Sequence, residues 1–411
     1  MNLFSWIFII TLLLGAILQW TLTRRQIGAV QKHRAQVPDA FSEQVTLAEH
    51  QKAADYTQVK AHFSLLLLPL EVLLLLAWTV GGLLNGLDQF WQTLGWSPVW
   101  TGVAVLLSFL MINHLIELPA GYYRTFKIES RFDFNRSNLK LFINDNLKGL
   151  VLMLLIGTPL AALVFWLMES AGSYWWLTVW LVWMSFSLLM LWAYPSFIAP
   201  LFNKFNPLEE GELKQRIEHL LQRNGLNSDG IFVMDGSKRS GHGNAYFTGL
   251  GKNKRIVFYD TLLEGLEAAE VEAVLAHEIG HFKRKHVVKR LVMMAVLSLS
   301  GLFLLAWLMQ QNWFYLGLGV TEASSYMALI LFMLVLPVFT AFISPIMARL
   351  SRKHEFEADD FAAQQADAQD LIRALVKMYR ENASTLTPDA CYSAFYDSHP
   401  PAPVRIAHLS Q

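Results

Sequence analysis

Seven long apolar segments constrain the fold of this chain more than any other feature of its sequence. A helix needs about 20 predominantly apolar residues to cross the hydrocarbon core of a bilayer. Charged residues make up only 16% of the chain, whereas soluble proteins carry about 25%. The sequence therefore predicts an all-α membrane protein with seven transmembrane helices, unless one or two runs are buried core helices. The runs cover approximately residues 3–22, 64–86, 98–118, 149–168, 174–200, 291–310 and 325–348.

The connections between these runs are of two kinds, which alternate along the chain. Short connections hold no Lys or Arg, and long ones hold many. By the positive-inside rule, the N-terminus lies outside and every long connection is cytoplasmic. The first run has no basic segment before it and no small-residue cleavage site after it, so we expect a retained helix rather than a signal peptide. The short connections are 87–97, 169–173 and 311–324, and the long ones are 23–63, 119–148, 201–290 and the tail from 349.

Charge and cysteine content exclude other classes of protein. The 33 basic and 33 acidic residues give no net charge, and a nucleic-acid partner would require a basic excess. The partner that the sequence predicts is the lipid bilayer, with no nucleic acid. Cys391 is the only cysteine, so no disulfide forms within the chain.

The long connection 201–290 has a mixed α/β pattern. A helical pattern covers 209–224, and a second helix starts after Glu264 and continues through His281. Short strands are expected at Ile231 to Met234, Ala245 to Leu250 and Arg255 to Tyr259. We therefore expect four parts: 1–200 with five transmembrane helices and cytoplasmic loops 23–63 and 119–148, 201–290 as a cytoplasmic α/β segment, 291–348 with the last two transmembrane helices, and 349–411 as a C-terminal cytoplasmic segment.

The second of these helices contains the sequence HEIGH at 277–281. His277 and His281 are four residues apart, so they project from one helical face and can bind one Zn²⁺. Glu278 lies beside them, where a carboxylate takes the proton of the attacking water in a metalloprotease. The alternative is a pair of surface histidines at a membrane boundary.

A catalytic zinc site of this type needs a third protein ligand. A metzincin motif is excluded because Arg284 and Val287 stand where Gly and His are required. Downstream of the seventh run, Glu355 and Asp359 share a helical face. Glu355 can then bind the metal while Asp359 accepts a hydrogen bond from a ligand histidine. Both segments emerge on the cytoplasmic side, although spacing alone equally allows an ordinary charged helix.

Several motifs together resemble the type I CaaX prenyl protease family, the integral-membrane zinc endopeptidases that include the yeast a-factor-converting enzyme. The resemblance covers nearly the whole chain, because unrelated motifs occur in the order and spacing of that family. They are ELPAGYYRTFKIESRFDFNRS (117–137), YPSFIAPLFNKFNPL (194–208), SGHGNAYFTGLGKNKRIVFYDTLL (240–263), AHEIGHFKRKH (276–286), SRKHEFEADDFA (351–362) and DSHPPAPVR (397–405).

The resemblance implies a fold and a set of roles. The fold is a seven-helix barrel around an intramembrane chamber, with a zincin-like site at its cytoplasmic end. One Zn²⁺ is bound by His277, His281 and Glu355, Glu278 is the general base, and Asp359 supports a ligand. Asn244 and His399 match residues that hold the substrate backbone or the oxyanion, and Arg352 and Arg405 match arginines near the site, with Arg405 expected to bind substrate. From local sequence alone, Asn244 is a turn residue and His399 a loop histidine.

The expected activity is hydrolysis of peptide bonds near the C-terminus of protein or peptide substrates, prenylated or not. An edge strand starting at NAYF would bind such a peptide through main-chain hydrogen bonds. A membrane quality-control zinc protease is the alternative, and a seven-helix transporter or receptor is a more distant one. We expect a multi-pass protein of the bacterial inner membrane, or of the endoplasmic reticulum if eukaryotic, with its catalytic side cytoplasmic.

Overall fold

A computed structural model describes residues 1–248 and 253–411. Within these residues, seven helical segments are long and apolar enough to cross a membrane, which confirms the predicted membrane fold. The helices are α1 (Leu3–His33), α2 (Leu47–Trp78), α3 (Leu83–Gln92), α4 (Pro98–Tyr123), α5 (Leu139–Ser170), α6 (Trp175–Ala193), α7 (Glu212–Arg223), α8 (Asp260–Gly265), α9 (Ala268–Lys283), α10 (His286–Leu308), α11 (Asn312–Gly317), α12 (Ser325–Thr340), α13 (Ser344–Gln365), α14 (Ala368–Glu381), α15 (Ala390–Tyr396) and α16 (Ala402–Leu409).

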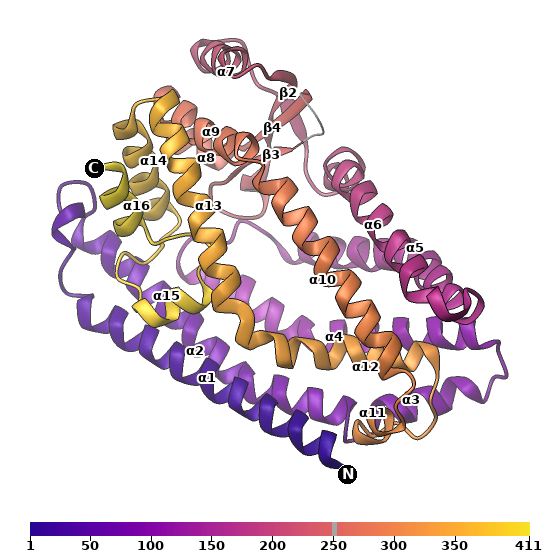
Figure 1. Cartoon of the computed structure of the whole chain (residues 1–411). Coiled ribbons are helices and arrows are strands. Elements are labelled where there is room, and N and C mark those ends of the chain that lie inside the picture. The colour runs from indigo at the N-terminus through magenta and orange to yellow at the C-terminus, as the bar shows by residue number, and fades with distance from the viewer. Residues whose placement is uncertain (249–252) are drawn as a thin grey trace.

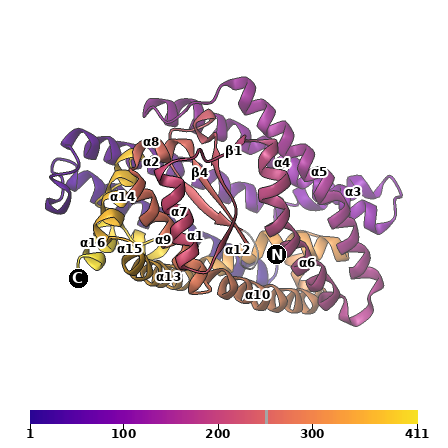
Figure 2. The same ribbon diagram turned by 90° about the horizontal axis from the view of Figure 1, so that it is seen from above.

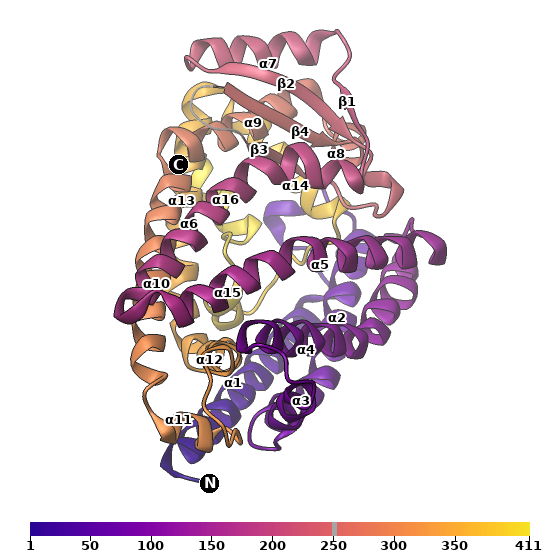
Figure 3. The ribbon, with the colours of Figure 1, turned by 90° about the vertical axis from the view of Figure 1, so that its right-hand side faces the viewer.

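The long helices form the wall of a barrel (Figure 1). The sheet and α7 to α9 lie at one end of it, and α3 and α11 lie at the other (Figures 1 and 3). Few residues of the wall are buried: only 11% of the most apolar window of Leu139–Ser170, and 6% of that of Gly172–Leu201. Because a packed bundle would bury one side of each helix, this low burial fits helices that face lipid on one side and an open interior on the other.

Two separate hydrophobic cores hold the ends of the barrel. One lies at the α3 and α11 end and includes Phe8, Phe165 and Phe314, all fully buried. The other packs α7, α9 and α14 against the sheet, with Ile217 and Phe258 at 0% exposure. The chain therefore places a soluble-type core directly on top of a membrane barrel.

The sheet has the order β1-β2-β4-β3. The strands are β1 (Phe205–Pro207), β2 (Asn227–Met234), β3 (Ala245–Thr248) and β4 (Asn253–Tyr259), with β2 and β4 parallel and the other pairs antiparallel. β3 is an edge strand, and β1 and β4 lie near the middle of the molecule in the view of Figure 2. The predicted strands are present in their described parts, and Gly249 and Leu250 lie outside the described residues.

Several boundaries differ from the sequence expectation. The second apolar run ends as a helix at Trp78 rather than at 86, because Thr79 leaves the helical conformation (ψ −104°), and Gly82 (φ +79°) then precedes the next helix. Residues 83–92 then form α3 instead of a loop. A separate short helix, α8, precedes the HEIGH helix, which begins at Ala268. The three-residue strand β1 was not predicted.

Candidate metal centre

The HEIGH motif lies on α9, and a capping box begins this helix. The backbone N–H of Glu267 donates to the Glu270 carboxylate at 2.8 Å, and the Glu267 carboxylate accepts from the backbone of Glu270 in return. Gly280 lets α9 approach α13 closely, because a Cβ at this position would lie 3.0 Å from the Cα of Ala358. The glycine of HEIGH thus brings the histidines within reach of the Glu355 helix.

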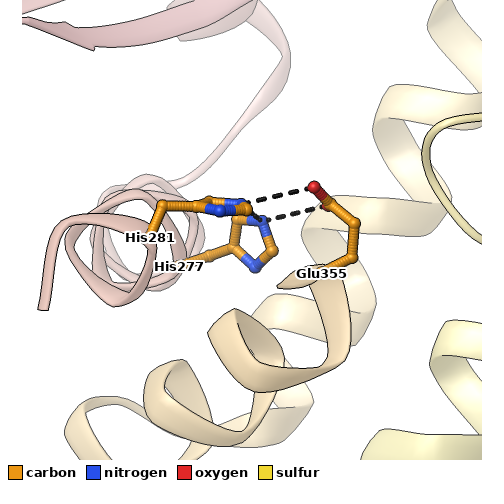
Figure 4. Close-up of side chains that lie close together, drawn as sticks. All are labelled: His277, His281 and Glu355. Atoms are coloured by element: carbon orange, nitrogen blue, oxygen red, sulfur yellow. Dashed lines mark hydrogen bonds and ion pairs between the residues drawn. The ribbon is translucent and has the colours of Figure 1, made fainter. Parts of the chain in front are cut away.

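Three potential ligand atoms converge between α9 and α13 (Figure 4). Nε2 of His277 lies 3.1 Å from Nε2 of His281, and each of these atoms lies 3.4 Å from an oxygen of Glu355. Ligand atoms bound to one tetrahedral zinc at about 2.0–2.2 Å lie about 3.3–3.6 Å apart. The two separations of 3.4 Å fall in this range and the separation of 3.1 Å is slightly shorter, so the three atoms lie close enough together to bind one metal ion.

The partners of His277 orient it as a metal ligand. Its Nδ1 lies 2.8 Å from Oδ1 of Asp359, whose carboxylate also pairs with the buried Arg405. An Nδ1–H that donates to Asp359 leaves the Nε2 lone pair directed at Glu355 and His281. Oε2 of Glu355 is buried without a hydrogen-bond partner. Acceptor atoms that face one another in this way call for a cation, so the residues present fit a metal.

His281 is held by a longer chain of contacts. Its Nδ1 lies 2.9 Å from Nδ1 of His286, and Nε2 of His286 lies 2.9 Å from Oε2 of Glu357. His286 is buried and stacks on His354 at 4.1 Å between ring centroids. If His286 donates to Glu357, it accepts from His281 and leaves Nε2 of His281 free to bind a metal. The sequence analysis did not identify His286 and Glu357 as partners of His281.

The titratable groups of α9 have shifted pKa values. Burial and the neighbouring His277 lower the pKa of His281 to about 3, which keeps this imidazole in the neutral form that binds metals. Burial acts to lower the pKa of His277, but hydrogen bonds to Asp359 and Glu355 raise it above its usual value. Burial raises the pKa of Glu278 despite the opposing charges of His277 and Arg405. A raised pKa suits a carboxyl group that accepts and returns a proton near neutral pH.

The C-terminal segment brings His399 to the same place. Nε2 of His399 lies 3.4 Å from Oε1 of Glu355, and the His399 side chain is 65% exposed. Arg352, one turn before Glu355, donates to the carbonyls of Ser393, Ala394 and Asp397 and so holds the segment that leads to His399. The exposed imidazole next to the ligands is accessible to a substrate.

The remaining two predicted site residues, Asn244 and Arg405, have different surroundings: Asn244 is exposed and Arg405 is buried. Asn244 directly precedes the edge strand β3, and its exposed side chain accepts a hydrogen bond from the N–H of Ala245 at 2.8 Å. Arg405 is buried behind His277, and its Nε donates to Asp359 at 2.9 Å. This position gives Arg405 a supporting contact with the ligand pair instead of an exposed surface for substrate.

Comparison with known protein families covers almost the whole chain. Residues 26–204 match the family model described as CAAX prenyl protease N-terminal, five membrane helices. Residues 207–411 match the model of peptidase family M48. The HEIGH helix and Glu355 both fall in the second region, and the second to fifth candidate membrane helices, from Leu47 to Leu201, fall in the first.

Individual relatives agree with the family models. The chain is 36% identical to the CAAX prenyl protease 1 homolog of Oryza sativa subsp. japonica over 75% of this chain and 72% of that protein. It is 32% identical to the homolog of Dictyostelium discoideum over 90% and 88%, respectively. The CAAX prenyl protease 1 of Saccharomyces cerevisiae is 36% identical over 75% and 72%.

A solved structure extends the similarity to the fold. The crystal structure of S. mikatae Ste24p superposes with a TM-score of 0.93 at 31% sequence identity, covering 100% of this chain and 99% of that one. The membrane barrel, the small sheet and the histidine–carboxylate centre thus occur in a chain whose relatives are peptidases. This chain is a multi-pass membrane metalloendopeptidase that belongs to the type I CaaX prenyl protease family, within peptidase family M48.

Proposed function

We propose that this metalloendopeptidase uses one zinc ion to hydrolyse peptide bonds near the C-terminus of CaaX-type substrates. The observation that carries the proposal is the convergence of His277, His281 and Glu355, with Glu278 on the same helix. Two imidazoles and one carboxylate are a donor set typical of catalytic zinc, which keeps one position open. When bound, the ion supplies positive charge that polarises the scissile carbonyl and acidifies the attacking water.

Glu278 transfers the proton in this proposal. Its carboxylate accepts a proton from the attacking water and delivers it to the amine of the leaving segment. Its raised pKa brings the acid and base forms closer in energy at neutral pH. His399 donates a hydrogen bond to the developing oxyanion, since its exposed imidazole lies beside Glu355.

The substrate backbone binds along β3. Strand β3 lies at the sheet edge, so an extended peptide can add as a further strand through main-chain hydrogen bonds. Asn244, directly before this edge strand, holds the end of the peptide that pairs with the start of β3. Asp359 and Arg405 act as positioning residues for His277.

The orientation follows from the charge of the loops. Long basic connections carry the metal site, so the positive-inside rule places the catalytic side in the cytoplasm and the N-terminus outside. A bacterial inner membrane is the favoured location, and the endoplasmic reticulum is the alternative for a eukaryotic source. The proposal includes prenylated proteins or peptides among the substrates. It includes no nucleic-acid partner.

The test combines a variant with a substrate panel. Glu278→Gln keeps a similar side chain but cannot accept the proton, so the rate of peptide cleavage should fall by about 10²- to 10⁴-fold while one zinc per chain remains. Glu264→Gln, on the neighbouring α8 and exposed, should cleave at the wild-type rate. Wild-type cleavage by Glu278→Gln would exclude Glu278 as the base.

The substrate panel separates the CaaX function from membrane quality control. Purified protein is offered prenylated CaaX peptides, the same peptides without the prenyl group, and an unfolded membrane protein. Cleavage three residues from the C-terminus of the peptides supports the proposal. Cleavage confined to the unfolded protein, at internal sites, would favour the quality-control alternative.

A further inference from the structure

A polar cavity of about 740 Å³ opens beside the metal centre. It lies between α1, α2 and the C-terminal segment, and His399 forms part of its wall. Cavities of about 300–1,000 Å³ commonly hold small ligands. Much of the wall can form hydrogen bonds, including the side chains of Gln19, Thr23, Gln26, Thr57, Ser64 and Asn382. A cavity of this size and polarity, reaching the residue beside Glu355, is suited to hold part of a substrate.

The direction of β3 determines which part of the substrate enters the cavity. The chain runs from His242, which lines the cavity, through Asn244 into β3. A peptide that pairs antiparallel with β3 has its C-terminal side next to the start of this strand. The residues after the scissile bond then point towards His242 and the cavity.

Charge in the cavity wall is concentrated on α2. Lys60 is the only lysine or arginine among the residues that line the cavity, within the described part of the chain. Its Nζ lies 4.5 Å from the centroid of the Tyr56 ring, and no described carboxylate is within 4.0 Å of it. Glu129, behind this ring, already accepts from Tyr56 at 2.7 Å and contacts His242 at 3.3 Å. Lys60 therefore presents to the cavity an ammonium group with no described carboxylate within ion-pair distance, and the charge of Glu129 acts on it from further away.

The described part of the cavity wall holds one opposing charge. Asp397 is the one carboxylate among the lining residues. Burial raises its pKa above the usual value, in spite of the nearby Arg352. An anion entering the cavity is thus attracted by the ammonium group of Lys60, while the charges of Arg352 and His399 act on Asp397 and offset part of its repulsion.

We propose that Lys60 binds the free C-terminal carboxylate of the substrate, while the metal centre cuts the chain a few residues before it. The inference rests on the proposed function and adds to it a recognition site for the substrate end. A charge-assisted hydrogen bond between an ammonium and a carboxylate is among the stronger polar contacts in proteins. An extended segment of three residues spans about 10 Å, so Lys60 would set the cleavage position by distance from the chain end.

The experiment compares two CaaX peptides that differ only at the C-terminus, one with a free carboxylate and one with a neutral amide. Purified full-length protein should cleave the acid with a kcat/KM about ten- to hundredfold higher than the amide, mainly through KM. In Lys60→Met, both peptides should be cleaved at the rate of the amide. In Lys60→Glu, the acid should become the poorer substrate, whereas Lys60→Arg should keep the preference.

Lys52→Met is the matched control. Lys52 is also on α2, but it lies outside the cavity and contacts Asp133 at 3.8 Å, so this variant should keep the wild-type preference for the acid. Zinc content and thermal stability are measured for each variant to show that it is folded. Equal cleavage of acid and amide by the wild type, or an unchanged preference in Lys60→Met, would overturn the inference and leave the proposed function intact. Cleavage of neither peptide by the wild type would contradict both.

Discussion

The two histidines of the candidate metal centre are held by different sets of contacts, although they are four residues apart on one helix. His277 contacts a carboxylate directly, and that carboxylate is fixed by the buried Arg405. On the Nδ1 side, His281 reaches a carboxylate only through a second imidazole, His286. The contacts of His277 are buried, and Asp359 is 0% exposed. The contacts of His281 end at Glu357, whose side chain is 28% exposed.

This difference shows two ways to orient a histidine, one through a buried ion pair and one through a partly exposed chain of hydrogen bonds. A buried charged pair such as Asp359 and Arg405 is rigid, but the loss of one member leaves the other charge without a partner. A relay that ends at a partly exposed carboxylate tolerates change, because water can replace the outer partner. The His277 side should therefore be the more sensitive of the two to mutation.

Asp359→Ala should give the largest effect. It removes the partner of Nδ1 of His277 and leaves Arg405 buried and unpaired, so we expect about 3–5 kcal/mol of destabilisation and a loss of zinc affinity of about 10- to 100-fold. Thermal unfolding and competition with a zinc chelator measure the two quantities. Asp360→Ala is the control, since Asp360 is exposed and contacts His408 on another face. Equal effects of the two variants would remove the special role of Asp359.

His286→Ala should have the next largest effect. Without the imidazole, the ring of His281 loses its hydrogen-bond partner, and zinc affinity should fall about tenfold with little change in the melting temperature of the barrel. Added free imidazole should restore part of this affinity. His354→Ala removes the stacking neighbour of His286 but not the relay, and it should bind zinc like the wild type. Full zinc affinity in His286→Ala would show that the relay is not needed.

Glu357→Gln should have a smaller effect still. The amide oxygen can still accept from His286, and the site is partly exposed, so zinc affinity should change by less than about threefold. The same chelator competition measures it. Lys353→Met, which removes an exposed cation 3.8 Å from Glu357, should leave the affinity unchanged. A loss as large as that in Asp359→Ala would contradict the ranking of the two sides.

The smallest effect should be on the pH dependence of kcat/KM. Glu278 must be deprotonated to accept a proton, and burial raises its pKa, so activity should decrease as the pH falls through that raised value. The charges that act on Glu278 come from His277, Glu355 and Arg405. His286→Ala and Glu357→Gln should therefore keep the acid limb of the wild-type profile. A shift of the acid side of the pH profile in either variant would show that the contacts of His281 influence the pKa of Glu278.

Much of the fold could be predicted because its strongest signals are local. An apolar run of about 20 residues predicts the part of a helix that crosses the hydrocarbon core. It does not predict how far the helix continues into water. Accordingly, α1 extends to His33, α2 starts at Leu47 and α13 reaches Gln365, well outside the predicted runs. The short strand β1 has no periodicity to detect, and Pro207 within it argues against a strand.

For the site, helical spacing predicted that His277 and His281 share a face, and the same rule paired Glu355 with Asp359. Spacing could not show that α9 and α13 meet, since their contact depends on the close approach at Gly280. The partnership of His286 and Glu357 was missed for the same reason. Helical spacing relates residues of one helix, whereas this hydrogen bond joins a residue of α10 to a residue of α13 that lies 71 positions later in the sequence.

The continuity of α13 has a mechanical consequence. This single helix begins at Ser344, next to the apolar segment, and carries Glu355 to the metal centre, while both imidazoles belong to α9. A change in bilayer thickness alters the tilt of membrane-spanning helices, and a tilted α13 would move one ligand relative to the other two. Bilayer thickness and the spacing of these three side chains are therefore connected through α13 and its junction with α12 at Ala341–Ile343.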